Sequence, residues 1–426
     1  MKFLFDMKKI ALSIILLGSL SAAFAQQSPI LSIESCYTLA VENYPLIKQK
    51  TIIEKTSEYT LSNISKSYLP QLSINAQGTY QSAVTQLPIA IPGMNIEGVS
   101  KDQYKIYGEI NQPLTDMIVL HQQKELIKSS AVVEGQKIDV ELYKLRERIN
   151  TIYFGILLVD EQMHQTELMR KDITNGLSKT ESAIANGIAL KSTALILKAE
   201  LLRVDQRIIE LKSTRKGLVE MLSIFINKPL NENSRFAIPL TLSNNNTINR
   251  PELKLFEVQR NSIAVQNKLI NAKSIPRVGL FLQTGYGRPA LNQLSNEFDT
   301  YYIGGLKLNW NISNYYTIRK EKKIVEFNQT AIDIQKESFL FNTSLSLSQQ
   351  NNEIKKYSEL LASDSEIITL RESVKTTASK QLENGTISAN DYLNYINAED
   401  QAKQNKLLHQ IQLLMAQYNY QLTTGN

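Results

Sequence analysis

The chain alternates between two patterns of apolar and polar positions, and the first of them predicts strands. In the stretch "SYLPQLSINAQGTYQ", residues 67–81, apolar side chains fall on every second position after a proline. A period of two is typical of a β-strand with one apolar and one mostly polar face. The same alternation returns three times. It predicts strands near residues 71–81, 103–112, 277–287 and 301–311.

The second pattern predicts long helices over most of the remaining chain. No proline occurs between Pro113 and Pro229, and none occurs after Pro289. Because proline costs about 3 kcal/mol inside a helix, such stretches are where long helices can form. The first stretch predicts a helix of roughly 70 residues before an Asn-Gly turn. A heptad spacing typical of coiled-coil packing occurs in the second stretch, at Leu347, Ile354, Leu361 and Ile368.

Matching segments at a constant separation predict an internal duplication. Pro45 and Pro251 are 206 residues apart, and so are Pro70 and Pro276, each of which precedes a predicted strand. An Asn-Gly turn follows the long helix in each half. The chain accordingly divides into repeat one, residues 26–228, a linker over residues 229–250, and repeat two, residues 251–426. The helical hairpin tips fall near residues 186–193 and 384–391.

The first 25 residues have the pattern of a signal peptide. Lys8 and Lys9 precede the apolar run "IALSIILLGSL", and "AFA" at residues 23–25 matches a small-x-small cleavage site. The apolar run is too short for a membrane anchor. Gln26 is therefore expected to begin an exported chain that has no membrane-spanning helix.

Charge and candidate chemistry change this picture little. The formal net charge is +6, or +4 without the first 25 residues, and cationic and acidic residues are interleaved. A small net charge with both signs interleaved does not indicate nucleic-acid binding. The single cysteine, Cys36, is expected as a small buried residue on the first helix. His121, His164 and His409 lack metal-ligand spacing and are expected on helix surfaces. No catalytic set, cofactor or metal site is predicted.

The apolar face of the predicted strands needs a partner. The rest of the chain is helical, so no second sheet can cover this face, whereas an outer membrane offers lipid to it and a water-filled lumen to the polar face. The residues expected to face lipid are Leu72, Ile74, Leu280, Leu282, Leu306, Leu308 and Trp310. Leu280 and Leu308 are expected near mid-strand, and Gln283 on the lumen face. Aromatic residues near the strand ends fit interfacial girdles: Tyr80, Tyr104, Tyr286, Tyr301, Tyr302 and Trp310.

Four strands cannot close a barrel by themselves. An open sheet edge in lipid leaves backbone groups unpaired, at several kcal/mol each. Several chains must therefore contribute strands to one barrel, which predicts an obligate oligomer. A single-chain porin is excluded because it needs more strands than this chain offers.

The order of these features resembles the TolC-like outer membrane channel family over essentially the whole mature chain. The resemblance is carried by the "YP" and "RP" starts, the "LP" and "IP" that precede strands, "NQPL" after the second strand, two "NG" tips and the ending "YNYQLTTGN". It implies an α+β membrane protein, a homotrimer whose twelve-stranded β-barrel takes four strands per chain. A long α-helical, coiled-coil-like periplasmic tunnel continues the barrel.

The resemblance also implies a function and partners. The family supplies the outer membrane channel of tripartite efflux or type I secretion systems, passively conducting substrates across the periplasm and outer membrane. Its partners are a periplasmic adaptor protein and an inner membrane transporter. Drug, metal and protein cargo share this outer component, so the cargo stays open. The alternative from another class is a secreted coiled-coil structural protein or adhesin, which explains the heptads but not the strands.

The resemblance further implies site residues at the periplasmic end. The closing aperture is expected at Asp391, Asn394 and Thr193. Asn394 stands where the family has a second acidic residue, and Ile387 stands where it has an arginine, so the charged latch is missing. Asp391 is equally explained as a helix cap. Adaptor docking is expected at the tips, at Gly187, Ile188, Ala189, Gly385, Thr386 and Ile387.

Overall fold

The computed structural model describes residues 30–85, 99–240 and 247–426. The predicted signal peptide, residues 1–25, lies outside these described residues. The chain divides into two compact units that interleave along the sequence. Of the described residues, one unit holds 30–44, 144–240, 247–248 and 345–426, and the other lies within residues 45–143 and 249–344. Two helices, α4 (Asp116–Ala185) and α7 (Asn314–Glu383), contribute residues to both units.

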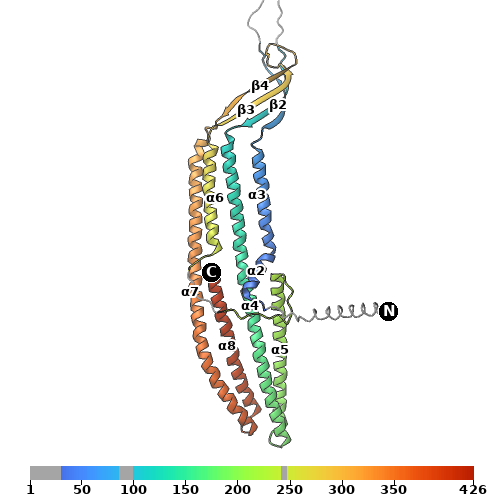
Figure 1. The fold of residues 1–426 in the computed structure, drawn as a ribbon, viewed down its shortest axis with the longest axis vertical. Coiled ribbons are helices and arrows are strands. Elements are labelled where there is room, and N and C mark those ends of the chain that lie inside the picture. Colours follow the sequence, from blue (N-terminus) through green and yellow to red (C-terminus); the bar gives the residue numbers. More distant parts are fainter. Residues whose placement is uncertain (1–29, 86–98, 241–246) are drawn as a thin grey trace, which may run out of the picture. The chain divides into compact units, whose positions relative to one another are not determined.

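The unit of residues 45–143 and 249–344 combines a sheet with helices (Figure 1). Its elements are the 3₁₀ helix η2 (Pro45–Ile47), α3 (Lys48–Lys66), β1 (Gln71–Tyr80), β2 (Asp102–Pro113), the start of α4, α6 (Pro251–Lys273), β3 (Arg277–Arg288), β4 (Asp299–Asn309) and the start of α7. Side-chain contacts join α3 to α4, α4 to α6, and α6 to α7: Lys50 with Asp139, Ser129 with Ser262, and Phe256 with Phe339. The helices of this unit therefore form a layer in the order α3, α4, α6, α7.

The four strands form one antiparallel sheet in the order β1-β2-β3-β4. β1, β2 and β3 lie within one residue, at each end, of the ranges that the alternation predicts. β4 begins and ends two residues earlier than the predicted range. Its last pair joins Asn309 to Arg277. The residue before Arg277 is Pro276, which has no N–H to donate to a further pair, so the ladder ends before Trp310.

The other unit is helical. It holds α2 (Ile33–Asn43), the rest of α4, α5 (Lys191–Ile226), the rest of α7, and α8 (Ala389–Thr424). Its core packs apolar side chains of α4, α5, α7 and α8, among them Ile173, Leu197, Ala378 and Ile396. Ser32 caps α2 by accepting a hydrogen bond from the Ser35 amide. α4 and α7 are each 70 residues long, and α5 and α8 are each 36. The duplication itself stays a prediction.

Cys36 lies fully buried on α2, which confirms the expectation for this residue. Burial raises the pKa of its thiol to about 11, because the charged thiolate is poorly solvated there. The hydroxyl of buried Tyr153 lies 2.8 Å from the Leu31 carbonyl and 2.7 Å from the Ala237 carbonyl. It thereby ties α4 to the parallel bridge between Leu31 and Phe236.

Among the described residues, no helix is both long enough and apolar enough to cross a membrane.

Candidate functional site

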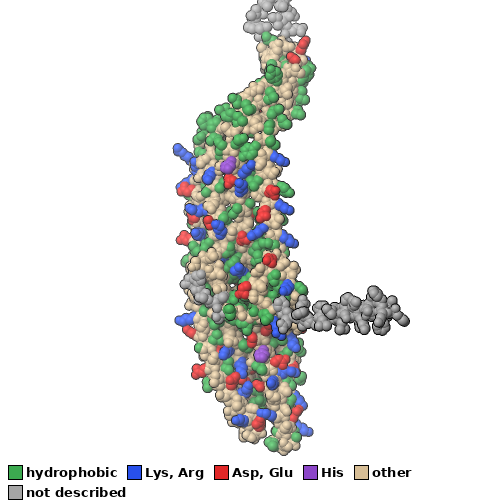
Figure 2. Space-filling view, in the orientation of Figure 1, with side chains coloured by type: hydrophobic (Ala, Val, Ile, Leu, Met, Phe, Trp, Pro, Cys, Tyr) green, Lys and Arg blue, Asp and Glu red, His purple; other side chains and the backbone are tan. Residues whose placement is uncertain are grey.

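One face of the sheet gathers the residues that the sequence predicts to contact lipid. Directly opposed residues of paired strands share a face, and Leu72 lies opposite Ile110, which lies opposite Leu282. The strand alternation and the remaining pairs place the other leucines and the isoleucine of the predicted set on this same face: Ile74, Leu280, Leu306 and Leu308. Leu72, Ile74, Leu306 and Leu308 are 67% to 83% exposed. Figure 2 shows hydrophobic side chains over the sheet, whereas charged side chains gather over the helices. Contact of this face with lipid stays a prediction.

One detail of the predicted lipid face is wrong, and the contact of Trp310 with lipid stays a prediction. Leu308 is the last residue but one of β4 and lies opposite Val278 at the start of β3, so it is not near mid-strand. Trp310 follows the end of β4. Its indole N–H donates to the Ser274 carbonyl at 3.2 Å, and its ring packs edge-on against Tyr315. Trp310 therefore anchors the strand end to the end of α6.

The opposite face is polar but also carries aromatic and aliphatic side chains. Gln283 lies on it, between Glu109 and Ile303, as predicted from the alternation. Tyr301 lies on this face as well and not in an outward girdle. A side chain at Gly285 would come within 3.0 Å of the Tyr301 ring, so the glycine leaves room for that ring. Phe281 lies against Gly305 in the same way. Small residues on one strand thus make space for rings on its neighbour.

The two hairpin tips are built from the same turn. Gly187 and Gly385 have φ angles of 73° and 67°, a left-handed conformation that favours glycine. The Ile188 amide donates to the Ala183 carbonyl, and the Thr386 amide donates to the Gln381 carbonyl, each at 2.9 Å. A bond of this span after a left-handed glycine closes a helix as a Schellman motif.

The structure brings the two predicted docking tips together. A side chain at Gly385 would lie 3.9 Å from Cγ2 of Ile188. Gly187, Ile188, Gly385 and Thr386 are exposed, whereas Ala189 and Ile387 are half-buried. Ile387 packs against the core of the helical unit. An apolar contact thus occupies the position where the resemblance implies an arginine.

Asp391 caps the start of α8. Its Oδ2 accepts hydrogen bonds from the Ser388 amide at 3.1 Å and the Ser388 hydroxyl at 2.6 Å, while the Ser388 Oγ accepts from the Asp391 amide. This reciprocal capping box also lowers the pKa of Asp391, first through the hydroxyl and then through the backbone donor. The capping role is therefore confirmed. The Asp391 side chain remains exposed, so it can also line an aperture.

The other two predicted aperture residues are less constrained. Asn394 is exposed on α8, one turn after Asp391, and Thr193 is half-buried in the first turn of α5. Among the described residues, no hydrogen bond joins either of them to Asp391. The aperture role of all three stays a prediction.

A network of ion pairs inside the helical unit was not predicted from the sequence. Lys375 of α7 lies 2.9 Å from Asp172 of α4 and 2.7 Å from Glu399 of α8. Lys403 joins Glu399, at 2.7 Å, to Glu372, at 2.9 Å. Glu399 is buried, with 4% of its side chain exposed. The spacing of Glu399 and Lys403 on one helix was a usable signal in the sequence, but the partners on α4 and α7 come from distant segments.

Burial and ion pairing shift the pKa values of the lysines in this network in opposite directions. Burial alone would lower the pKa of Lys375. The hydrogen bonds to Glu399 and Asp172 outweigh it, and the pKa of Lys375 is raised. The pKa of Lys403 is raised in the same way by Glu399 and Glu372. Both lysines therefore stay charged at neutral pH and fasten three helices to one buried carboxylate.

The histidines offer no metal site. His121 and His164 are exposed on α4, as expected. The expectation is wrong for His409, which is partly buried and bonded through Nδ1 to the buried Asp364 at 2.7 Å. No group of three or more His, Cys, Asp or Glu side chains in the described part of the chain is placed to hold a metal ion.

Comparisons with known proteins identify the fold. No family model matches the sequence, and no curated protein sequence matches it. Solved structures match over 92% of this chain. The outer membrane protein VceC of Vibrio cholerae matches over 96% of its length, at 11% identity and a TM-score of 0.65. The open state of the outer membrane channel MtrE of Neisseria gonorrhoeae matches over 89%, at 14% identity and a TM-score of 0.63. The outer membrane channel CmeC of Campylobacter jejuni matches over 85%, at 12% identity and a TM-score of 0.63.

Proposed function

The chain has the fold of the TolC-like outer membrane channels, and from this premise we propose that it is itself an outer membrane channel that conducts substrates passively. It serves a tripartite efflux or type I secretion system and extends from the outer membrane into the periplasm. The matching structures are described as channels or outer membrane proteins, which also supports a role other than catalysis.

The observation that carries this proposal is the two-faced sheet. Its outward side is apolar and exposed on all four strands, and no described segment covers it. Burying such a face in lipid gains about 25 cal/mol for each Å² removed from water. The opposite side offers Gln, Asn, Lys and Glu side chains to a water-filled lumen. An alternation of this kind is the pattern of an outer membrane barrel strand.

The sheet edges support a homotrimer. β1 and β4 each pair with one neighbour, so each leaves one edge of backbone groups unpaired. Three chains would contribute twelve strands and close the barrel, with β4 of one chain pairing with β1 of the next. Closure is required because an unpaired edge in lipid costs several kcal/mol per group.

The tips support an assembly with periplasmic partners. They expose apolar side chains, notably Ile188 and Leu190, beside the two left-handed glycines. We assign this end to docking of a periplasmic adaptor, which connects the channel to an inner membrane transporter. The missing arginine at Ile387 and the capped Asp391 leave a single acidic ring at the aperture of the assembled channel.

Reconstitution of the purified chain into planar lipid bilayers tests the proposed function. Discrete conductance steps are expected, together with recovery of the chain in the outer membrane fraction and a need for detergent in purification. A chain that is secreted, stays soluble without detergent and gives no conductance would contradict the channel. That result would favour a coiled-coil structural protein or adhesin.

A further inference from the structure

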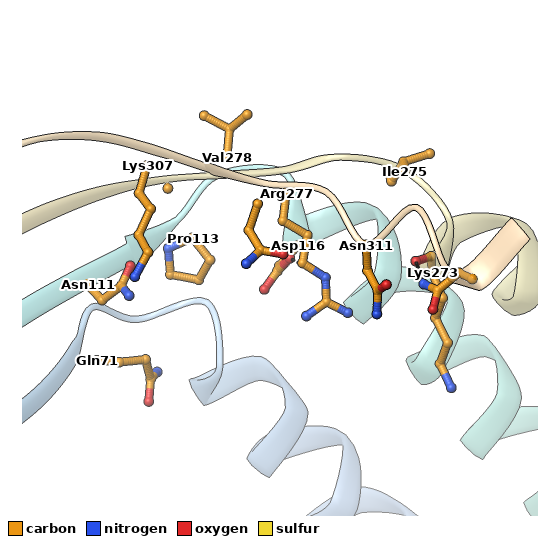
Figure 3. A pocket seen from close by; sticks show the side chains of 13 residues that line it. Gln71, Asn111, Pro113, Asp116, Lys273, Ile275, Arg277, Val278, Lys307 and Asn311 are labelled. Atoms are coloured by element: carbon orange, nitrogen blue, oxygen red, sulfur yellow. Dashed lines mark hydrogen bonds and ion pairs between the residues drawn. The ribbon is translucent and has the colours of Figure 1, made fainter.

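A pocket of about 490 Å³ lies where the strands of the sheet meet the helices of the same unit. It is bounded by the ends of all four strands and by residues of α4, α6 and α7. Its lining is rich in amide side chains, from Gln71, Asn111, Asn309, Asn311 and Asn314. Figure 3 shows the Arg277 and Lys307 side chains on one side of β3 and β4 and Val278 on the other.

Cationic side chains outnumber acidic ones in the pocket lining. Lys273, Arg277 and Lys307 are the cations, and Asp116 is the single acid. Glu109, which shares the polar face of the sheet, lies beyond Asn111 on β2 and does not line the pocket. The lining therefore has an excess of two formal positive charges in each chain.

Helix ends explain two of these four charged residues. Asp116 lies in the first turn of α4 and Lys273 in the last turn of α6, where each charge interacts favourably with the helix dipole. Arg277 and Lys307 lie on strands, so the dipoles do not account for them. Helix ends therefore do not explain the positive charge of Arg277 and Lys307 in this pocket.

The Arg277 and Lys307 side chains carry N–H donors that make no hydrogen bond to the described residues. The nearest acidic atom to the guanidinium of Arg277 is Oδ1 of Asp116, 3.7 Å from Nε, which is longer than a hydrogen bond. Lys307 makes no ion pair and no hydrogen bond among the residues that the structure describes, and its side chain points toward Asn111 (Figure 3). A planar guanidinium beside an ammonium group, with amides around them, matches the acceptors of a carboxylate or phosphate group.

We propose that this pocket binds anionic groups, carboxylate or phosphate, carried by the cargo, with Arg277 and Lys307 as the binding residues. The inference rests on the proposed function, because that function puts the polar face of the sheet in the lumen. Three copies of the pocket then give the barrel base a basic ring, opposite in sign to the acidic ring of Asp391. The barrel base thus selects for cargo with an acidic group.

Binding of inorganic pyrophosphate to the detergent-solubilised full chain tests the proposal. Isothermal titration at low ionic strength, where screening is weak, is expected to show saturable binding. Arg277→Gln with Lys307→Gln should weaken it at least about tenfold, since hydrogen bonds to charged groups are lost. Arg277→Lys with Lys307→Arg keeps both charges and should retain most of the affinity. Lys212→Gln with Lys216→Gln removes the same charge from the exposed surface of α5 and should leave the affinity unchanged.

The outcomes separate this inference from the proposed function. If the wild-type chain conducts in bilayers but does not bind pyrophosphate, the proposed anion site is wrong and the proposed channel function is unaffected. Equal loss of affinity in the pocket variant and the α5 variant also overturns it, because binding would then follow net charge alone. A chain that binds pyrophosphate through Arg277 and Lys307 but forms no channel keeps the site and contradicts the proposed function. Trimer mass and helical content of each variant confirm that it is folded.

Discussion

Gly187 and Gly385 are set apart from the helical glycines by their backbone. Both have positive φ, and a side chain in that conformation costs about 1–2 kcal/mol. Gly385→Ala should therefore loosen its tip, seen as faster amide hydrogen exchange across residues 382–390. Gly217→Ala is the matched control, because it lies inside α5 with no atom within 4 Å of the new carbon. Alanine there should leave exchange unchanged or slow it. Equal effects at the two positions would contradict the tip assignment.

Asp391 has a confirmed role in the capping box of α8 and a predicted role in an acidic ring at the aperture. Two variants separate these roles. Asp391→Asn removes the charge and keeps a side-chain oxygen that can accept the hydrogen bonds of Ser388 in the capping box. An acidic ring at the aperture should attract cations, so this variant should reduce any preference for cations in planar bilayers without disturbing the trimer. Ser388→Ala removes the hydroxyl of the capping box and keeps the charge. It should leave the ion preference intact and speed amide exchange in the first turn of α8. Unchanged selectivity in Asp391→Asn would leave only the capping role.

The pKa of Asp391 gives the cap a pH dependence. It is lowered by the two donors of Ser388, so the folded chain holds the carboxylate charged more firmly than the unfolded chain does. The stabilisation is present above the ordinary aspartate pKa of about 4 and is lost as the pH falls through the lowered value. The protection of amides at the start of α8, taken relative to their intrinsic exchange rate at each pH, should fall only below about pH 4. The charge of the ring is thus constant at neutral pH.

At the scale of elements, the strand register predicts a depth in the membrane for each residue expected to face lipid. Leu282 lies in the middle of β3, whereas Leu308 lies near the end of β4. Leu282→Arg should cost about 2–4 kcal/mol at the bilayer midplane, and Leu308→Arg about 0–1 kcal/mol nearer the interface. Gln283→Arg, on the opposite face beside Leu282, should be tolerated. The yields of folded trimer from the three variants test this order of free-energy costs. Equal yields from Leu282→Arg and Gln283→Arg would show that the faces are assigned wrongly.

The sequence was sufficient for elements that depend on local pattern. Alternation located all four strands, and the absence of proline located α4 and α7. The end of β4 was missed because it depends on its partner strand: Pro276 precedes β3 and ends the ladder at the pair of Arg277 and Asn309. His409 and the Lys375 network were missed for the same reason. Their partners, Asp364 and Asp172, become neighbours only when distant helices pack.

The ion network makes a prediction for helix packing. Lys375→Met leaves the buried Glu399 with Lys403 as its remaining cation. The cost should be about 3 kcal/mol, the lower end for breaking a buried ion pair, since one partner stays. The exposed pair of Lys198 and Glu181 is the control, and Lys198→Met should cost under about 1 kcal/mol. Denaturant unfolding of both variants gives the comparison.

The raised pKa of Lys375 adds a pH test of the same network. Its stabilisation is complete below the ordinary lysine pKa of about 10.4 and is lost as the pH rises through the higher folded value. Lys375→Met should therefore remove part of the alkaline destabilisation expected of the wild-type chain. An identical alkaline profile in wild type and variant would mean that the network contributes nothing measurable.

At the scale of the whole molecule, the described sheet has four strands and two open edges. β1 and β4 end the sheet, and the apolar face spans both of these edge strands. A soluble protein would blunt such edges with charges or cover them. Here the edge strands carry Leu72, Ile74, Leu306 and Leu308 instead. The proposed channel would resolve both features together, because pairing between chains within a membrane would satisfy the edge backbone and cover the apolar face.

The last prediction is that pairing, as a trimer with β4 of one chain beside β1 of the next. Mass measurement in detergent should give three chains per particle. Single cysteines placed along β1, each combined with one along β4, should cross-link chains in one strand register and give bands up to the trimer. The background is low because the only native cysteine, Cys36, is fully buried. The matched control is a pair of cysteines on β2 and β3, which already pair within one chain and should not link chains. A monodisperse monomer with full strand content, or cross-links that stop at the dimer, would contradict the closed barrel.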